Sequence, residues 1–144
     1  ADTVNLSVDG FELELKGQIN DQLFAALSYA NYDGETSPGT QAREIPESTV
    51  TGWINYQVND GFGYGLGFTK QGESQVGNGA RSGGILPDYT RWDAAAYWTL
   101  SNDLSVQLNI ENLTDEEYFP HAHSKHQVSV GEELNARVSL NYSF

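Results

Sequence analysis

The carboxyl end of the chain alternates strictly between apolar and polar positions. From Leu134 to Phe144 the sequence reads LNARVSLNYSF, and every second residue, up to the last, is apolar or aromatic. A period of two indicates a β-strand, because successive side chains of a strand point to opposite faces of the sheet. The pattern predicts a strand with one apolar and one polar face that continues to the final residue. The last residues of a domain are more often loose.

The same alternation predicts six further strands, which come in three pairs. These strands are predicted at 11–19, 23–32, 50–58, 62–69, 92–100 and 104–110. An Asn-Asp turn separates the two members of each pair, at Asn20-Asp21, Asn59-Asp60 and Asn102-Asp103. No apolar set repeats at the helical spacing of three and four residues. The chain is therefore predicted to be all-β and antiparallel, with seven clear strands.

Long polar segments alternate with these tight turns. They are predicted as loops at 33–47, 72–87 and 119–132. Transmembrane barrels sort their connections in this way, with short periplasmic turns and longer extracellular loops. Polar strand faces also suit a wet lumen, because unpaired charges are costly in a dry core. The sequence predicts an antiparallel up-and-down transmembrane β-barrel segment. An ordinary antiparallel sheet with aromatic residues in its core is the alternative.

The number of predicted strands indicates whether the chain could form a whole barrel. An eighth strand from Thr3 to Val8 is an alternative, with Asp9-Gly10 as its turn, because Asp-Gly favours a tight hairpin. Bacterial barrels made of one chain have even strand numbers, so seven strands predict a piece of something larger. A closed eight-stranded cylinder would contradict that prediction.

The amino-acid composition excludes several classes of partner and of chemistry. The 144 residues suit one domain, and 20 acidic against 7 basic residues give a formal charge of −13, which argues against a nucleic-acid partner. The absence of cysteine excludes disulfides and thiolate chemistry. No run of apolar residues is long enough for a transmembrane helix. Because the chain begins without Met or a signal sequence, it is expected to be a mature form or a fragment.

Two motifs near the carboxyl end resemble a known family. They are LPDYTRWDA, from Leu86 to Ala94, and ENLTDEEY, from Glu111 to Tyr118. Together with the strand ending at Phe144, they resemble the carboxyl end of a TonB-dependent outer-membrane receptor of the siderophore-receptor type. The segment DGFELEL, which begins at Asp9, resembles an earlier strand of the same family. One departure is Thr114, where members commonly have Phe.

The resemblance implies what surrounds the chain. A complete member has an amino-terminal plug, a short box that binds TonB, and a much larger barrel. Residues 1–144 would be a single segment, the carboxyl-terminal part of that barrel without the plug. The implied location is the bacterial outer membrane, in contact with its lipid. The terminal strand, with Leu140, Tyr142 and Phe144, would be the signal read by the barrel assembly machinery.

The resemblance also implies a function. The complete protein would take up a ferric siderophore or a similar metal chelate, with TonB acting through the missing plug. The alternative is a small self-contained outer-membrane barrel with a structural or adhesive role. No nucleophile elbow or ordered triad is visible, so the sequence predicts no catalytic residue and no enzyme. No cofactor is expected.

All three histidines of the chain fall within one long loop. His121, His123 and His126 are candidate contacts for an iron chelate or another surface ligand, while a divalent metal and plain solvation are alternatives. No cysteine or clearly placed carboxylate completes a metal site, so no resident metal is predicted. The other candidate ligand contacts are Tyr118, Phe119, Arg81 and Arg43.

A row of glycines alternates along one predicted strand. Gly61, Gly63, Gly65 and Gly67 lack the spacing of a dinucleotide-binding loop, and no helix follows them. They are predicted to be small residues on the inward face, leaving room for a plug or for close backbone approach.

Overall fold

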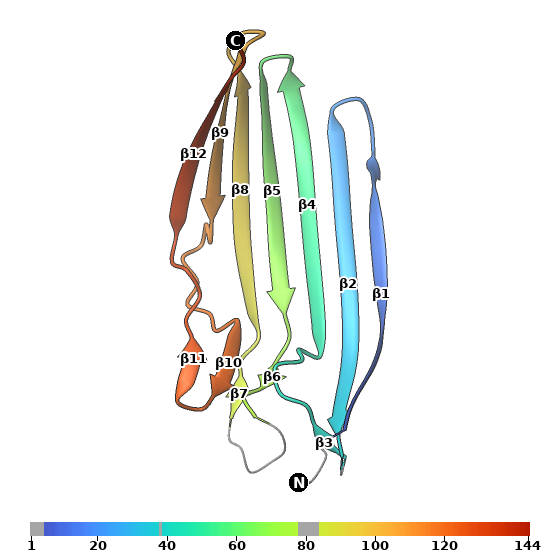
Figure 1. Ribbon diagram of the computed structural model, residues 1–144. Helices are drawn as coiled ribbons and strands as arrows, with labels where there is room; N and C mark the ends of the chain where they lie inside the picture. Colours follow the sequence, from blue (N-terminus) through green and yellow to red (C-terminus); the bar gives the residue numbers. More distant parts are fainter. Residues whose placement is uncertain (1–4, 38, 78–83) are drawn as a thin grey trace.

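Seven long strands stand side by side in the computed structural model and form one antiparallel sheet (Figure 1). The structure describes residues 5–37, 39–77 and 84–144. The strands of this sheet follow the order of the chain and are β1 (Leu6–Gln18), β2 (Leu23–Thr36), β4 (Ser48–Asn59), β5 (Phe62–Gln71), β8 (Tyr89–Thr99), β9 (Leu104–Glu111) and β12 (Asn135–Tyr142). Within the described residues, β1 and β12 each pair on one side only, so the sheet is open. The predicted all-β, up-and-down arrangement with seven clear strands is confirmed.

Short turns and long loops lie at opposite ends of the sheet. Figure 1 shows the three short turns and the carboxyl terminus at the top, and the long connections toward the bottom. The long connections are loop 1 (residues 37–47), loop 2 (residues 72–88) and loop 3 (residues 112–134). The described residues contain no helix that is long and apolar enough to cross a membrane.

The first and third short turns share one hydrogen-bond pattern. The amide of Leu23 donates to the carbonyl of Asn20, and the amide of Leu104 donates in the same way to Ser101. The Asn20 side chain accepts from the amides two and three residues on, and the Ser101 hydroxyl accepts from the amide of Asp103. Ser101, and not Asn102, is therefore the structural equivalent of Asn20.

The predicted eighth strand is wrong. Strand β1 runs without a break through Asp9-Gly10, and these residues lie opposite Asp33 and Tyr32 on β2. Strand β2 continues to Thr36, beyond its predicted end at Tyr32, so the first part of β1 has a partner. Pairing with β2 therefore overrides the turn preference of Asp-Gly, and a Cβ at Gly10 would clash with the Asn31 carbonyl. Residues 1–4 lie outside the described part.

Each long loop contains strands too short to produce a readable alternation. Strand β3 (Thr40–Gln41) extends the sheet beside β2, and β6 (Ser74–Gln75) pairs with β7 (Ile85–Leu86). Strand β10 (His121–Ser124) forms a hairpin with β11 (Gln127–Ser129). Loops 1, 2 and 3 therefore contain short paired strands, where the sequence predicted plain loops.

The two faces of the sheet differ in chemistry. On one face the pairing aligns apolar side chains across strands, and many large ones are exposed, among them Leu15 at 57%, Leu27 at 44% and Val138 at 68%. The other face carries polar residues, including Asn55, Thr51 and Asp93, which line shallow hollows with their neighbours. An exposed apolar face of this size needs an apolar environment or a partner.

The predicted position of the alternating glycines on one face holds for three of the four, because Gly61 lies in the turn before β5. Gly63, Gly65 and Gly67 are buried on the polar face, opposite Gln57, Asn55 and Trp53 on β4. The space above Gly65 and Gly67 is taken by the Trp53 ring. The glycines therefore make room for a neighbouring side chain of the same sheet.

Candidate functional site

Loops 1, 2 and 3 meet in one layer at the end of the sheet. Arg43 of loop 1 donates from Nη1 to the carbonyl of His123 in loop 3, at 3.2 Å. The amide of Glu44 donates to the carbonyl of Gln75 in loop 2, at 2.9 Å, and the Gln75 side chain donates to that of Gln41. Segments far apart in the sequence are thus joined into a single surface.

A small apolar cluster joins loops 2 and 3. Val76, Leu86 and Ala122 are buried together, with Ala122 fully inaccessible to solvent, and Phe119 packs against them. Ala122 is the inward residue of β10, so this contact anchors the β10–β11 hairpin. Phe119, a candidate ligand contact, therefore belongs to the packing of the loop layer.

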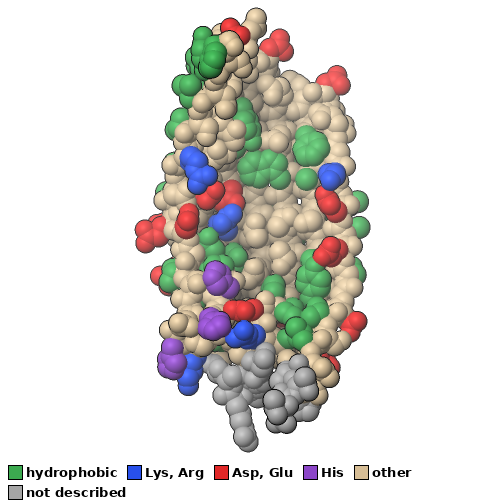
Figure 2. Space-filling model, viewed as in Figure 1, with side chains coloured by type: hydrophobic (Ala, Val, Ile, Leu, Met, Phe, Trp, Pro, Cys, Tyr) green, Lys and Arg blue, Asp and Glu red, His purple; other side chains and the backbone are tan. Residues whose placement is uncertain are grey.

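The histidines remain at the surface. His121 and His123 are exposed on either side of Ala122, and His126 is exposed at the hairpin turn. Figure 2 shows the three histidine side chains along the hairpin, close to basic and acidic groups. His121 Nε2 lies 2.9 Å from the hydroxyl of Ser129. Within the described residues, no three or more His, Cys, Asp or Glu side chains are close enough to hold a metal ion.

Tyr118 is part of an internal stack. It is only 6% exposed, its ring centroid lies 4.6 Å from that of Tyr89, and its hydroxyl accepts from Arg91 Nη1 at 3.2 Å. Arg91 also forms an ion pair with Asp93, at 2.8 Å, in a half-buried position. The sequence placed Arg91 in the LPDYTRWDA motif but did not single it out as a site residue.

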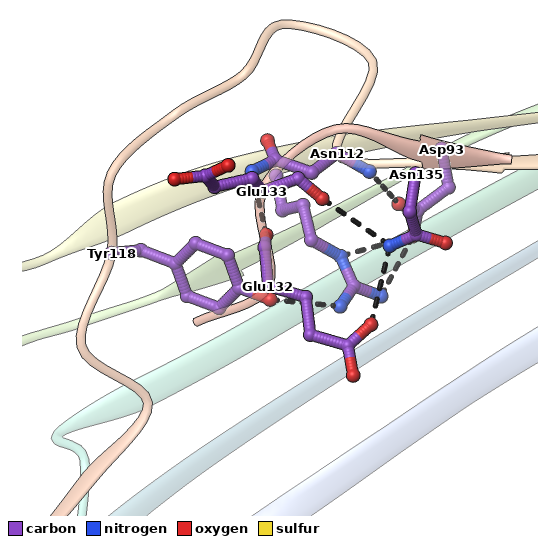
Figure 3. A network of polar contacts seen from close by, with 7 residues as sticks. Asp93, Asn112, Tyr118, Glu132, Glu133 and Asn135 are labelled. Atoms are coloured by element: carbon purple, nitrogen blue, oxygen red, sulfur yellow. Dashed lines mark hydrogen bonds and ion pairs between the residues drawn. The ribbon is translucent and has the colours of Figure 1, made fainter. Parts of the chain in front are cut away.

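The ENLTDEEY motif forms a compact junction at the base of loop 3. Asn112 is 1% exposed, and its side-chain oxygen accepts from the amide of Glu116. Its Nδ2 donates to the carbonyls of Glu116 and Glu132, at 2.9 and 3.0 Å. Its own amide donates to Asp93, and Figure 3 shows Asp93, Asn112 and Glu132 converging beside Tyr118. The side chain of one buried residue therefore joins both ends of loop 3, and its backbone amide joins them to β8.

An open pocket of about 420 Å³ lies between the β10–β11 hairpin and the polar face of the sheet. The charged and polar side chains that line it are Arg91, Glu111, Tyr118, His121, Glu132 and Arg137. Among the described residues, Arg137 and Glu111 have no ion-pair partner. Guanidinium and imidazole groups can bind anionic oxygens, and the carboxylates can accept from donors on a ligand.

The pocket includes some of the predicted site residues and not others. Tyr118 and His121 line it, whereas His123, Phe119 and Arg43 belong to the loop layer beside it. Arg81 lies outside the described residues. The sequence did not identify Arg137 and Glu111, although both fall on polar positions of alternating strands next to loop 3, which is the signal that could have found them.

The proposed assembly residues lie on the apolar face. Leu140 and Tyr142 are 65% and 62% exposed, and Phe144 is fully exposed, with its ring 6.3 Å from that of Tyr142. Their role in barrel assembly stays a prediction.

Known proteins resemble this chain over most of its length. The siderophore receptor PiuA of Acinetobacter baumannii is 29% identical over 95% of the chain, which covers 20% of that receptor. The ferrioxamine B receptor of Salmonella typhimurium is 30% identical over 94% of the chain, which covers 21% of it. The crystal structure of PiuA superimposes with a TM-score of 0.80, covering 95% of this chain and 22% of PiuA. The chain thus spans about a fifth of the length of these relatives.

A family model identifies the fold family directly. The model described as "TonB dependent receptor-like, beta-barrel" matches residues 4–113, most of the chain. That match spans β1 to β9 and includes the glycine row and the start of the ENLTDEEY motif. The chain therefore belongs to the family of TonB-dependent-receptor-like β-barrels.

Proposed function

We propose that this chain is the carboxyl-terminal wall of an outer-membrane receptor that takes up a ferric siderophore or a similar metal chelate. The family consists of outer-membrane transport receptors, and the relatives named above are a siderophore receptor and a ferrioxamine B receptor. The observation that carries the proposal is the loop layer, where loops 1, 2 and 3 meet beside a pocket. Arg137 and Glu111 line this pocket and have no ion-pair partner among the described residues. The proposal includes no catalytic role for the chain or for the pocket.

The two faces of the sheet support a position in the membrane. The exposed apolar face, with residues such as Leu27 and Ile54, would contact the hydrocarbon of the outer membrane, and the polar face would line the lumen. The short turns would then be periplasmic and the loop layer extracellular. TonB would act through a plug outside this chain, and the barrel assembly machinery would read the terminal strand.

Ligand contact is best assigned to the exposed side of loop 3 and to the pocket below it. His121, His123 and His126 remain accessible, and Arg137 and Glu111 offer charges with no ion-pair partner in the described part of the chain. Tyr118 and Phe119 would act mainly by holding loop 3 in place. The small self-contained barrel is not supported, because the relatives are about five times as long and, among the described residues, the sheet has two open edges.

Replacing loop 3 tests the proposal. In the complete receptor, residues 119–130 would be exchanged for a short Gly-Ser linker, which keeps the junction around Asn112. Cells lacking the native gene would be supplied with ferric hydroxamate and ferric catecholate siderophores carrying radioactive iron. We expect the intact receptor to import at least one of these chelates, and the exchange to lower that uptake about tenfold or more, the effect of losing 1.4 kcal/mol of binding.

A matched control separates binding from assembly. The variant Asp60→Ser alters a short turn at the opposite end of the sheet and should leave uptake unchanged. The amount of each receptor in the outer membrane is measured in parallel. Unchanged uptake after the exchange would remove loop 3 from the ligand site, and the absence of uptake of any tested chelate by the intact receptor would count against the proposed function.

A further inference from the structure

The pairing of the last strand presents a register problem. Within the part of the chain that the structure describes, strand β12 has one partner, β9, with Gln107 opposite Ser139. Its alternating pattern excludes a slip by one residue, which would exchange the two faces, but a slip by two residues keeps every side chain on its proper face. Tight turns fix the register of the three short hairpins. β9 and β12 are instead joined by the long loop 3, which imposes no such limit.

The junction at the base of loop 3 supplies the missing constraint. Asn112 follows β9 directly, and its Nδ2 donates to the carbonyl of Glu132 at 3.0 Å. Asp115 Oδ1 accepts from the amide of Leu134 at 2.9 Å, one residue before β12 begins. These two bonds connect fixed positions after β9 to fixed positions before β12. A slip by two residues would break both.

The junction is itself held in place. The amide of Asn112 donates to Asp93 Oδ1 at 2.9 Å, and the amide of Leu113 donates to the carbonyl of Trp92. Both acceptors belong to β8, the neighbour of β9 on its other side. Asn112 and Asp115 have positive φ angles of 53° and 52°, a conformation that Asn and Asp tolerate better than most residues. The backbone therefore presents the two side chains in fixed positions relative to the sheet.

We propose that Asn112 and Asp115 are positioning residues that set the register of β12 against β9. They thereby set the height of the last residues of β12 relative to the rest of the sheet. A slip by two residues would move Phe144 by about 6.6 Å along the strand. This would displace the aromatic terminus relative to the short-turn edge, where the amide of Ser143 bonds the carbonyl of Asp103. The proposal rests on the chain being part of a closed barrel, but its test needs no ligand.

Cysteine pairs report the register directly in a complete receptor whose cysteines outside this segment have been replaced, because residues 1–144 contain no cysteine. Gln107→Cys with Ser139→Cys reports the observed pairing, and opposite Cα atoms of an antiparallel pair lie within disulfide range. Gln107→Cys with Arg137→Cys or with Asn141→Cys reports a slip by two residues in either direction. After oxidation, crosslinking is measured by gel mobility. We expect only the first pair to crosslink efficiently in the parent protein.

Variants of the junction give the decisive comparison. Asn112→Gly tolerates the positive φ but removes the side chain, and Asp115→Ala removes the acceptor. We expect each to raise crosslinking of a slipped pair by about tenfold, which corresponds to 1.4 kcal/mol. Asp115→Asn keeps an acceptor oxygen and should behave like the parent. Crosslinking confined to the Gln107–Ser139 pair in every variant would overturn the proposal.

A variant that fails to assemble is also informative. If Asn112→Gly abolishes the barrel, the observed-register pair Gln107→Cys with Ser139→Cys should restore it, because the disulfide formed in the oxidising periplasm replaces the lost constraint. A slipped pair should not restore it. The proposal would be overturned if the Gln107–Ser139 disulfide forms but does not restore assembly. Asn112 would then act in some way other than by setting the register. Uptake of iron is not measured, so the outcome is independent of the ligand.

Discussion

At the scale of single residues, the polar face is shaped by one tryptophan and the glycines opposite it. Trp53 lies against Gly65 and Gly67 on the neighbouring strand, and a Cβ on Gly67 would collide with its ring and crowd the carbonyl of Gly52. Interiors at native density do not absorb an added methyl group without strain. The glycines are therefore required by the position of Trp53.

The change Gly67→Ala should destabilise the complete receptor by about 1–3 kcal/mol, the usual cost of overpacking. Thermal unfolding in detergent, followed by circular dichroism, measures the effect. The matched control is Gly17→Ala on β1, where a Cβ would meet nothing within 4 Å. When Trp53 is also replaced by Ala, the change Gly67→Ala should lower the stability less than it does when the Trp53 ring is present. An equal loss in both backgrounds would show that the ring is not the obstacle.

At the scale of elements, the alternation of apolar and polar residues predicted the long strands but not the short ones. The long strands carry enough alternating residues to be recognised, as between Leu134 and Phe144, and the Asn-Asp turns mark their ends. Strands of two to four residues, such as β6 and β10, are too short for a period to be visible. The continuation of β1 through Asp9-Gly10 depends on pairing with the end of β2, which no local pattern encodes.

The candidate site was predicted in part for the same reason. The sequence correctly placed the histidines in a long loop, because loops are recognised by composition. The contacts of Tyr118 with Arg91 and of Ala122 with Val76 join segments that are distant in the sequence. Their proximity follows from the packing of loops 2 and 3, which a single sequence does not specify.

The β10–β11 hairpin should detach when its anchor is made polar. Ala122→Asp places an unpaired carboxylate in the cluster with Val76 and Leu86, at a cost of at least about 1–3 kcal/mol. Limited trypsin digestion of the complete receptor should then cut after Lys125 about tenfold faster, because cleavage follows the population of the open form.

The control for that experiment lies directly across the hairpin. Val128 is the pairing partner of Ala122 but is 39% exposed, so Val128→Asp adds the same charge without entering the cluster. Its digestion rate should stay close to that of the parent. Equal rates for the parent and Ala122→Asp would indicate that the apolar cluster does not hold the hairpin.

At the scale of the whole molecule, the sheet has two kinds of unsatisfied surface. Within the described residues, β1 and β12 each leave one edge without a partner strand, and the apolar face between them is exposed. In hydrocarbon, unpaired backbone groups on an edge cost several kcal/mol each, so only a closed barrel satisfies them. In water, such edges are templates for pairing with other chains. Neither environment suits the chain by itself.

The isolated 144-residue chain is therefore expected to associate through β1 and β12. Refolded in detergent micelles, it should form oligomers or aggregates that retain β-structure by circular dichroism, with a mass by light scattering above that of one chain. Proline substitutions at residues whose amides point to the open edges, such as Glu14→Pro on β1 and Val138→Pro on β12, should reduce this association, because proline removes a hydrogen-bond donor from each edge. A monodisperse monomer with a stable β-sheet spectrum would contradict this prediction. It would show that the isolated chain folds alone and that its edges do not need further strands.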